Sequence, residues 1–405
     1  MLIANPRAVR APYPAPLQAL LSVARARESR QWLSQWDGIA RGATPLYELP
    51  DLAARLGVAR VSLKDESVRS PLGSFKALGA PIALVRQILR LHPDLDPAAL
   101  LAGRHAALLQ DYTVISATDG NHGRGLAAAA RSVGCRCVIV LHAQVSPERE
   151  QAIAQHGALI VRIEGNYDES VTQAARLAAA QGWQVVSDTS YEGYEDIPRD
   201  VMQGYATIAA EVVEQTGAVA DQPGAFTHVF LQGGVGGLAA GLASFFWEFH
   251  GAQRPSFIVV EPAQADCLLQ SALAGRPARA TGSVDSVMAG LACGETSPLA
   301  WRFLQPCVDG FMTIADAAAV QAMRVLAAGG ARDLPIVAGE SGVAGLAGLQ
   351  ALRADAAAAR HFGLDGHARV LLVNTEGATA PAVYEQLVGE PAWAVRARQA
   401  AWRAR

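Results

Sequence analysis

The sequence predicts an α/β protein built on parallel sheets. Short apolar runs alternate with alanine-rich helical segments from residue 44 to residue 390, and most runs are followed by a turn and then a helix. The chain has 405 residues, of which 51% are hydrophobic, so it can bury a large core. A chain of this length and composition is expected to form two lobes.

The expected strands are the short apolar runs. In chain order they are Arg60–Leu63, Tyr112–Ala117, Cys137–Leu141, Leu159–Ile163, Gln184–Ser187, His228–Leu231, Phe257–Glu261, Phe311–Ile314 and Val370–Asn374. In folds of this kind, ligands bind at the carboxyl ends of the strands. The residues directly after each run are therefore the candidate functional residues.

Composition and charge exclude several classes of protein. The net charge of -3 leaves no basic footprint for nucleic acid, and the basic C-terminal stretch is expected to be a solvated helix. No stretch approaches the length of a membrane span, and the proline-rich N-terminus does not resemble a signal peptide. We expect a cytoplasmic protein whose partner is a small molecule.

The five cysteines have irregular spacing. They form neither a disulfide framework nor a zinc pattern, which indicates a reducing compartment and predicts no metal site. Cys267 and Cys293 both fall in predicted loops and could approach each other, but the sequence alone does not pair them.

Lysine is scarce in this chain. Lys64 and Lys76 are the only lysines, whereas the other 32 basic residues of the 34 are arginines. Of these two kinds of side chain, only lysine can form an imine with an aldehyde. Lys76 is the better candidate of the two. Ser74 resembles an N-cap, and residues 77–89 are expected to form the helix that follows it. The positive end of that helix would favour a neutral amine on Lys76. The alternative is that the arginine bias is compositional and both lysines are incidental.

Two turns carry anion-binding features. Ala117–Gly125 contains Asp119 and Asn121, and its backbone amides can bind an anion while Asn121 can bond a ring hydroxyl. Gln232–Leu238 is rich in glycine and precedes an expected helix over 239–249, an arrangement that suits a phosphate. It matches neither a nucleotide P-loop nor a dinucleotide fingerprint. Taken singly, either turn could be ordinary strand-to-helix geometry.

A third turn, Asn374–Ala378, follows the last expected strand. The hydroxyl of Thr375 could contact a pyridine nitrogen without requiring that nitrogen to be charged. By itself this turn could equally be an ordinary strand end. His122, in the first turn, is more often a structural residue than a catalyst.

A lysine at a helix start, an asparagine-bearing turn, a phosphate-type glycine loop and a strand-end hydroxyl, in that order, resemble the fold-type II pyridoxal-phosphate enzymes. The detailed match is to the diaminopropionate ammonia-lyase family, on the segments Ala117–Gly125, Asp188–Tyr194, Met288–Glu295 and Asn374–Gly377. The resemblance runs from about residue 42 to residue 388. It implies two three-layer αβα domains with the cofactor in the interdomain cleft, residues 1–79 and 201–405 forming the large domain and residues 80–200 the small one.

The resemblance also implies roles for individual residues. Lys76 would bind the aldehyde of pyridoxal 5'-phosphate, Asn121 its phenolic oxygen, and Thr375 would face its pyridine nitrogen. The cofactor phosphate would be held by Gly233, Gly234, Val235, Gly236 and Gly237. Asp119 and Asp188 would be the bases for the D and the L isomer of the substrate, respectively.

The implied reaction converts 2,3-diaminopropionate to pyruvate and ammonia, in a protein expected to be a homodimer. The nearest alternative is a serine/threonine dehydratase of the same fold, although these enzymes usually carry serine where Asp119 stands. A non-catalytic protein that binds pyridoxal phosphate is a second alternative, which the two candidate bases argue against. A nucleotide-binding module is a more distant third.

Overall fold

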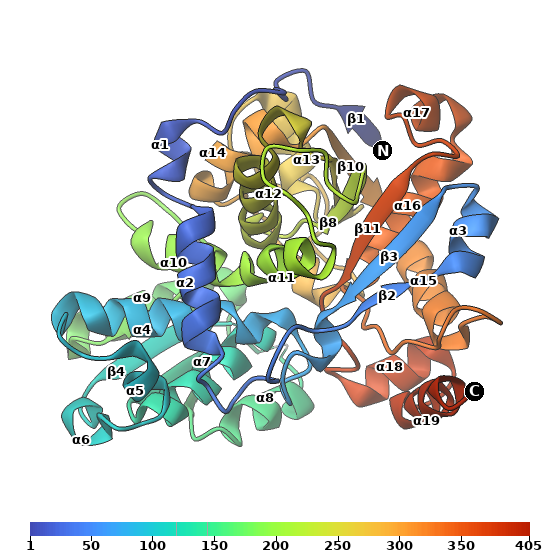
Figure 1. Cartoon of the computed structure of the whole chain (residues 1–405). Coiled ribbons are helices and arrows are strands. Elements are labelled where there is room, and N and C mark those ends of the chain that lie inside the picture. The colour runs from blue at the N-terminus through green and yellow to red at the C-terminus, as the bar shows by residue number, and fades with distance from the viewer. Residues whose placement is uncertain (119, 144) are drawn as a thin grey trace. The chain divides into compact units, whose positions relative to one another are not determined.

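The computed structural model describes residues 1–118, 120–143 and 145–405 (Figure 1). These residues form two compact units. Unit 1 comprises Met1–Val23, Ala43–Val68 and Ile208–Arg405, and unit 2 comprises Ala24–Gly42 and Arg69–Thr207. Each unit contains its own sheet, so the predicted α/β class is confirmed.

The sheet of unit 1 has the strand order β1-β10-β9-β8-β11-β3-β2. Its strands are β1 (Leu2–Ala4), β2 (Leu46–Glu48), β3 (Arg60–Asp65), β8 (His228–Gln232), β9 (Ser256–Pro262), β10 (Gly310–Ile314) and β11 (Arg369–Asn374). The inner strands pair in parallel, whereas β1 and β2 pair antiparallel at the two edges. These two edge strands were not predicted, because each has only three residues.

Helices cover both faces of the unit 1 sheet, because alternate residues of a strand point to opposite sides. Phe230 and Leu372 belong to a core shared with α15 and α16. Phe257 and Phe311 lie on the other face, against Phe246 of α12 and Trp301 of α14, respectively. The helices lying wholly or mostly in this unit are α1 (Ala15–Gln18), α3 (Pro50–Leu56), α11 (Thr207–Gln215), α12 (Gly237–His250), α13 (Cys267–Ala274), α14 (Pro298–Cys307), α15 (Asp316–Ala328), α16 (Ala344–Ala354), α17 (Ala356–His361), α18 (Pro381–Val388) and α19 (Ala392–Arg403).

The sheet of unit 2 has the order β6-β5-β4-β7 and is parallel throughout its described pairs. Ile115 and Val138 share a core with Ala174 of α9, while Ile139 faces Gly123 of α7 on the opposite side. The strands are β4 (Thr113–Ala117), β5 (Arg136–Leu141), β6 (Leu159–Arg162) and β7 (Gln184–Val185). The helices are α2 (Val23–Leu33), α4 (Gly79–Leu91), α5 (Pro97–Leu101), α6 (Ala106–Leu109), α7 (Asn121–Val133), α8 (Pro147–Ala154), α9 (Tyr167–Gln181) and α10 (Asp196–Tyr205).

The boundaries of the compact units differ from the predicted ones, which gave residues 1–79 and 201–405 to a large domain and residues 80–200 to a small domain. Residues 24–42, 69–79 and 201–207 belong to unit 2, together with the whole of the predicted small domain. Side-chain contacts explain the first difference, because Glu28 of α2 pairs with Arg86 of α4 at 2.8 Å. Close backbone packing explains the second, since a Cβ on Gly125 of α7 would lie 2.9 Å from the carbonyl oxygen of Lys76.

The predicted N-cap at Ser74 is wrong. Phe75–Ala77 forms a short 3-10 turn, η2, and the α-helix begins only at Gly79. The Ser74 hydroxyl makes no capping bond and, among the described residues, no other hydrogen bond, although it is buried. Lys76 therefore precedes α4 and does not lie in its first turn.

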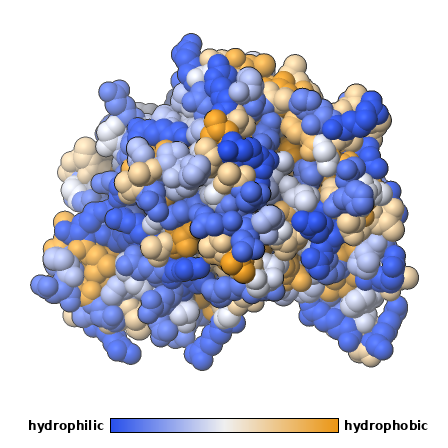
Figure 2. Space-filling view, turned by 45° about the horizontal axis from the view of Figure 1, so that its top comes forward, coloured by the Kyte–Doolittle hydropathy of each residue, from blue (hydrophilic) through white to orange (hydrophobic). Residues whose placement is uncertain are grey.

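The C-terminal helix α19 was predicted and is present. Trp393 is 72% exposed, and Arg398 pairs with Glu390 at 2.5 Å. Figure 2 shows mainly hydrophilic residues, with scattered hydrophobic ones, on the face that it presents. None of the helices in the described part of the chain has the length and hydropathy that a membrane crossing requires.

Lys64, on β3, is fully enclosed in unit 1. Its amine donates to Glu211 Oε2 at 2.6 Å, to the Thr44 carbonyl oxygen at 2.7 Å and to Gln215 Oε1 at 3.0 Å. The Lys64 and Glu211 side chains are 0% and 2% exposed. Three oxygen acceptors match the three donors of an ammonium group, so this lysine has a structural role.

We predict that Lys64→Met lowers the free energy of unfolding by about 3–5 kcal/mol, because it leaves the Glu211 carboxylate buried without its cation. Arg60→Met on the same strand is the control. It breaks the half-exposed Arg60–Glu48 pair and should cost less than about 1 kcal/mol. Urea unfolding measures both. If Lys64→Met lowered the free energy of unfolding no more than Arg60→Met does, the structural role of Lys64 would be contradicted.

Candidate functional site

Lys76 pairs with Asp188 within unit 2. Lys76 Nζ lies 2.5 Å from Asp188 Oδ2, and the two side chains are 19% and 20% exposed. The amine also lies 5.2 Å from the ring centroid of Phe75 and 5.5 Å from that of Tyr205. The sequence selected both members of this pair but did not predict their contact.

The two charges of the pair stabilise each other. Burial alone would lower the pKa of Lys76, but the charge and hydrogen bond of Asp188, together with Tyr205, outweigh it, so the pKa of Lys76 is raised. Burial alone would raise the pKa of Asp188, but Lys76 and, to a lesser extent, His122 outweigh it, so the pKa of Asp188 is lowered. The neutral amine predicted from the helix dipole is therefore wrong, because Asp188 dominates the field at Lys76.

Parallel pairing of β4 and β7 brings the residues after both strands to one edge of the sheet. Asn121 begins the helix after β4, and Asp188 follows β7. His122 Nε2 lies 2.9 Å from the Val186 carbonyl oxygen, which can only accept, so Nε2 donates. His122 Nδ1 then lies 3.8 Å from Asp188 Oδ2. Asp119 lies outside the described residues.

Tyr194 holds the segment that carries Asp188. Its hydroxyl accepts from the Ser187 amide at 2.9 Å and donates to the Val185 carbonyl oxygen at 3.0 Å. The Tyr194 ring stacks on Tyr191, with centroids 4.8 Å apart. Both tyrosines lie in the segment Asp188–Tyr194, but nothing in the local sequence predicts that their rings stack or that Tyr194 bonds the backbone.

In unit 1, the glycine loop follows β8 and leads into α12. Gly234 and Gly236 have φ of 64° and 99°, values that favour glycine. A Cβ on Gly233 would lie 2.4 Å from Glu261 Cγ, so a side chain there would fill the loop's base. Within the described chain, the amides of Gly234, Val235 and Gly237 donate to no backbone acceptor. Free amides at the start of a helix suit a phosphate.

Glu261, at the end of β9, lies beneath this loop. Its carboxyl group accepts from the amides of Leu268 and Leu269 at 2.9 and 2.8 Å, which stabilises the start of α13. Burial raises the pKa of Glu261 to about 8, against the opposing effect of these two bonds. The raised pKa lessens the negative charge that this group presents beneath the loop. Sequence reasoning named Glu261 but gave it no role.

Thr375 follows β11, which pairs in parallel with β8, so it lies at the same edge of the sheet as the glycine loop. Thr375 is buried, with 3% of its surface exposed. The neighbouring Glu376 accepts from the Ser341 amide at 3.1 Å, and its carbonyl accepts from Gly339 at 2.8 Å. The 339–342 segment thus packs against the end of β11.

All five cysteines are free thiols, including Cys267 and Cys293. Cys267 donates to Glu261 Oε1 at 3.7 Å and to the Gly234 carbonyl oxygen at 3.4 Å. Burial raises the pKa of Cys267, so it is protonated. No group of three or more metal-ligating side chains occurs among the residues that the structure describes.

The fold agrees with comparisons to known proteins. A family model described as pyridoxal-phosphate dependent enzyme matches residues 39–376. A diaminopropionate ammonia-lyase of Salmonella typhimurium is 39% identical over 85% of this chain and 87% of its own. The holo crystal structure of the Escherichia coli diaminopropionate ammonia lyase is 36% identical, covers 96% of both chains and has a TM-score of 0.86. The same enzyme with an aminoacrylate-PLP azomethine reaction intermediate is 36% identical over 96% of both chains, with a TM-score of 0.84.

We predict that Asp188→Asn lowers the pKa of Lys76 in cofactor-free protein, because the burial of the amine remains while the attracting charge is lost. The chain has only two lysines, so carbon-13 labelling of lysine gives two Cε signals to follow through a pH titration by NMR. Asp196→Asn, which removes a 66% exposed carboxylate from α10, is the control. An unchanged midpoint for Lys76 in Asp188→Asn would show that Asp188 does not set its charge.

Proposed function

Because this chain belongs to the pyridoxal-phosphate dependent enzymes, and within them to the diaminopropionate ammonia-lyase family, we propose that it converts D- and L-2,3-diaminopropionate to pyruvate and ammonia. The observation that carries this proposal is the Lys76–Asp188 pair, which joins a primary amine to a candidate base. Identity to the curated lyases along most of the chain supports the choice of substrate.

The residues present fit pyridoxal phosphate. The glycine loop offers free amides at the start of α12, which suits a phosphate group. Lys76 would hold the aldehyde carbon through its amine, Asn121 would bond the phenolic oxygen, and Thr375 would face the pyridine nitrogen. When bound, the cofactor supplies an electron-withdrawing ring that stabilises the negative charge left by loss of the substrate α-proton.

Asp188 acts as the base for the L isomer in this proposal, and Asp119 for the D isomer. A base on one side of a planar group reaches only one of its faces, so an enzyme that accepts both isomers needs an acceptor on each face. The lowered pKa of Asp188 means that its carboxyl group is ionised in the cofactor-free protein. Tyr194, through its bonds to Val185 and Ser187, orients the segment that carries Asp188.

A carboxylate near the substrate also explains a preference for a diamino acid. The second ammonium group of diaminopropionate can donate a charge-assisted hydrogen bond to Asp119 or Asp188, which the hydroxyl of serine does less well. The substrates of a serine/threonine dehydratase carry no second ammonium group that such a carboxylate would bind. This argument favours the lyase over the dehydratase.

We place the enzyme in the cytoplasm as a homodimer. Free thiols at all five cysteines are compatible with a reducing compartment. The dimer is an expectation from the family resemblance. Gel filtration with light scattering on the purified protein tests the dimer.

The first test is pyruvate release by cofactor-loaded protein supplied with D- or L-2,3-diaminopropionate, L-serine or L-threonine. We expect fast release from both diamino acids. The kcat/KM for the hydroxy amino acids should be at least about tenfold lower, because these substrates lack one charge-assisted hydrogen bond to the enzyme. Release only from serine or threonine would assign the protein to the dehydratases. Absence of release from all four, with cofactor bound, would indicate a binding protein.

The second test separates the two bases. We expect Asp188→Asn to lower kcat for the L isomer by about 10²–10⁴-fold and Asp119→Asn to do so for the D isomer, each sparing the other isomer. Asp196→Asn is the matched control and should leave both rates unchanged. Equal losses on both isomers in either variant would contradict the two-base assignment.

A further inference from the structure

Tyr205, the last residue of α10, lies buried beside Lys76 in unit 2. Only 1% of its surface is exposed, and its ring packs against Phe75 with the ring centroids 4.6 Å apart. The Lys76 amine lies 5.5 Å from the Tyr205 ring centroid, within the distance at which a cation interacts with an aromatic face. The ring and the hydroxyl of Tyr205 have no part in the reaction proposed above.

The hydroxyl of Tyr205 is unusual for a buried group. Buried tyrosine hydroxyls usually have a hydrogen-bond partner, because an unpaired polar group costs free energy. Tyr205 Oη is buried and makes no hydrogen bond of ordinary geometry within the described chain. Burial also raises the pKa of Tyr205, so the phenol keeps its proton and can accept as well as donate. This hydroxyl is therefore available to a group that moves toward it.

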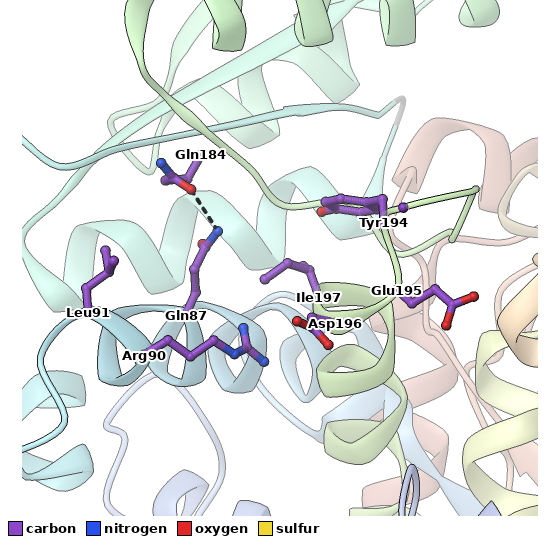
Figure 3. Close-up of a pocket in the computed structure, with 9 residues that line it drawn as sticks. Gln87, Arg90, Leu91, Gln184, Tyr194, Glu195, Asp196 and Ile197 are labelled. Atoms are coloured by element: carbon purple, nitrogen blue, oxygen red, sulfur yellow. Dashed lines mark hydrogen bonds between the residues drawn. The ribbon is translucent and has the colours of Figure 1, made fainter.

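Helices α4 and α10 pack antiparallel, and their contact is open at one end. Figure 3 shows the open end, a pocket of about 630 Å³ where α4 finishes and α10 begins. Gln87 and Arg90 of α4 line this pocket together with Ile197 of α10. Tyr205 lies at the opposite end of the helix pair, where α4 begins.

Close packing holds the Tyr205 ring at that end. A Cβ on Gly79, the first residue of α4, would lie 2.5 Å from Tyr205 Cε1, so a side chain there would displace the ring. A Cβ on Gly204 would lie 2.2 Å from the Leu78 carbonyl oxygen, so α10 approaches the start of α4 through its backbone. The ring therefore has little room to turn, and it stays beside Lys76.

Asp188 cannot both hold the Lys76 amine and accept a proton from a substrate. Lys76 Nζ donates to Asp188 Oδ2 at 2.5 Å and, against the effect of burial, lowers the pKa of that carboxyl group. A carboxylate held in this way is a weaker base. Burial lowers the pKa of Lys76, whereas Asp188 and then Tyr205 raise it. Tyr205 is therefore a second group that can stabilise this amine.

We propose that Tyr205 is a positioning residue, whose hydroxyl accepts a hydrogen bond from the Lys76 ammonium and so frees Asp188 to act as a base. The inference rests on the function proposed above. The ammonium exchanges one acceptor for another, and no covalent bond changes in this step. Because Asp119 is the base for the D isomer in that function, loss of the Tyr205 hydroxyl should affect mainly the L isomer.

The first test follows the Lys76 Cε signal by NMR in cofactor-free protein that carries Asp188→Asn, in which Tyr205 is the remaining stabilising group. Adding Tyr205→Phe keeps the ring and removes the hydroxyl, and it should lower the titration midpoint of Lys76 by about one pH unit. Tyr112→Phe is the matched control, because it removes another buried hydroxyl that has no hydrogen-bond partner among the described residues. It should leave the midpoint unchanged. The Lys64 signal reports whether each variant remains folded.

The second test measures turnover by the cofactor-loaded protein. Tyr205→Phe should lower kcat for L-2,3-diaminopropionate about tenfold more than kcat for the D isomer, whereas Tyr112→Phe should change neither. Equal losses on the two isomers, or an unchanged Lys76 midpoint in the first test, would overturn the proposal. The first test needs no turnover. A lowered midpoint in a protein that releases no pyruvate would therefore support the contact with Tyr205 and count against the proposed function alone.

Discussion

Parallel pairing of strands is the constraint on which the candidate residues of each unit depend. It brings the ends of β4 and β7 together in unit 2, so that His122 and Asp188 lie 3.8 Å apart. In unit 1 it brings the glycine loop and Thr375 to one edge, after β8 and β11. A slip of one residue in either register would turn alternate side chains to the wrong face and separate these groups.

Much of the fold could be predicted, because burial leaves a pattern in the chain. Each of the nine apolar runs forms a strand, with ends that shift by a residue or two. The edge strands β1 and β2 could not be predicted, since three half-buried residues carry no such pattern. The start of α4 was misplaced at Ser74, where a capping residue stands but η2 intervenes.

The site was less predictable than the fold. Lys76 was selected because lysine is scarce, and its pairing with Asp188, 112 residues away, is visible only in the structure. The charge of Lys76 was mistaken, because it depends mainly on that partner and not on the local helix. Tyr194 and Glu261 were missed as contributors, since one acts through backbone bonds and the other through the burial that raises its pKa.

The burial of Lys64 limits how readily this protein reacts with free aldehydes. Reducing sugars and simple aldehydes condense with accessible primary amines, whereas guanidinium groups do not form such imines. With Lys64 0% exposed, Lys76 and the N-terminal amine are the primary amines left accessible in the chain. The protein therefore offers very few sites for glycation, and an amine-reactive dye added to cofactor-free protein would report mainly on the N-terminal amine, because Met1 is 73% exposed whereas Lys76 is 19% exposed and held protonated by Asp188.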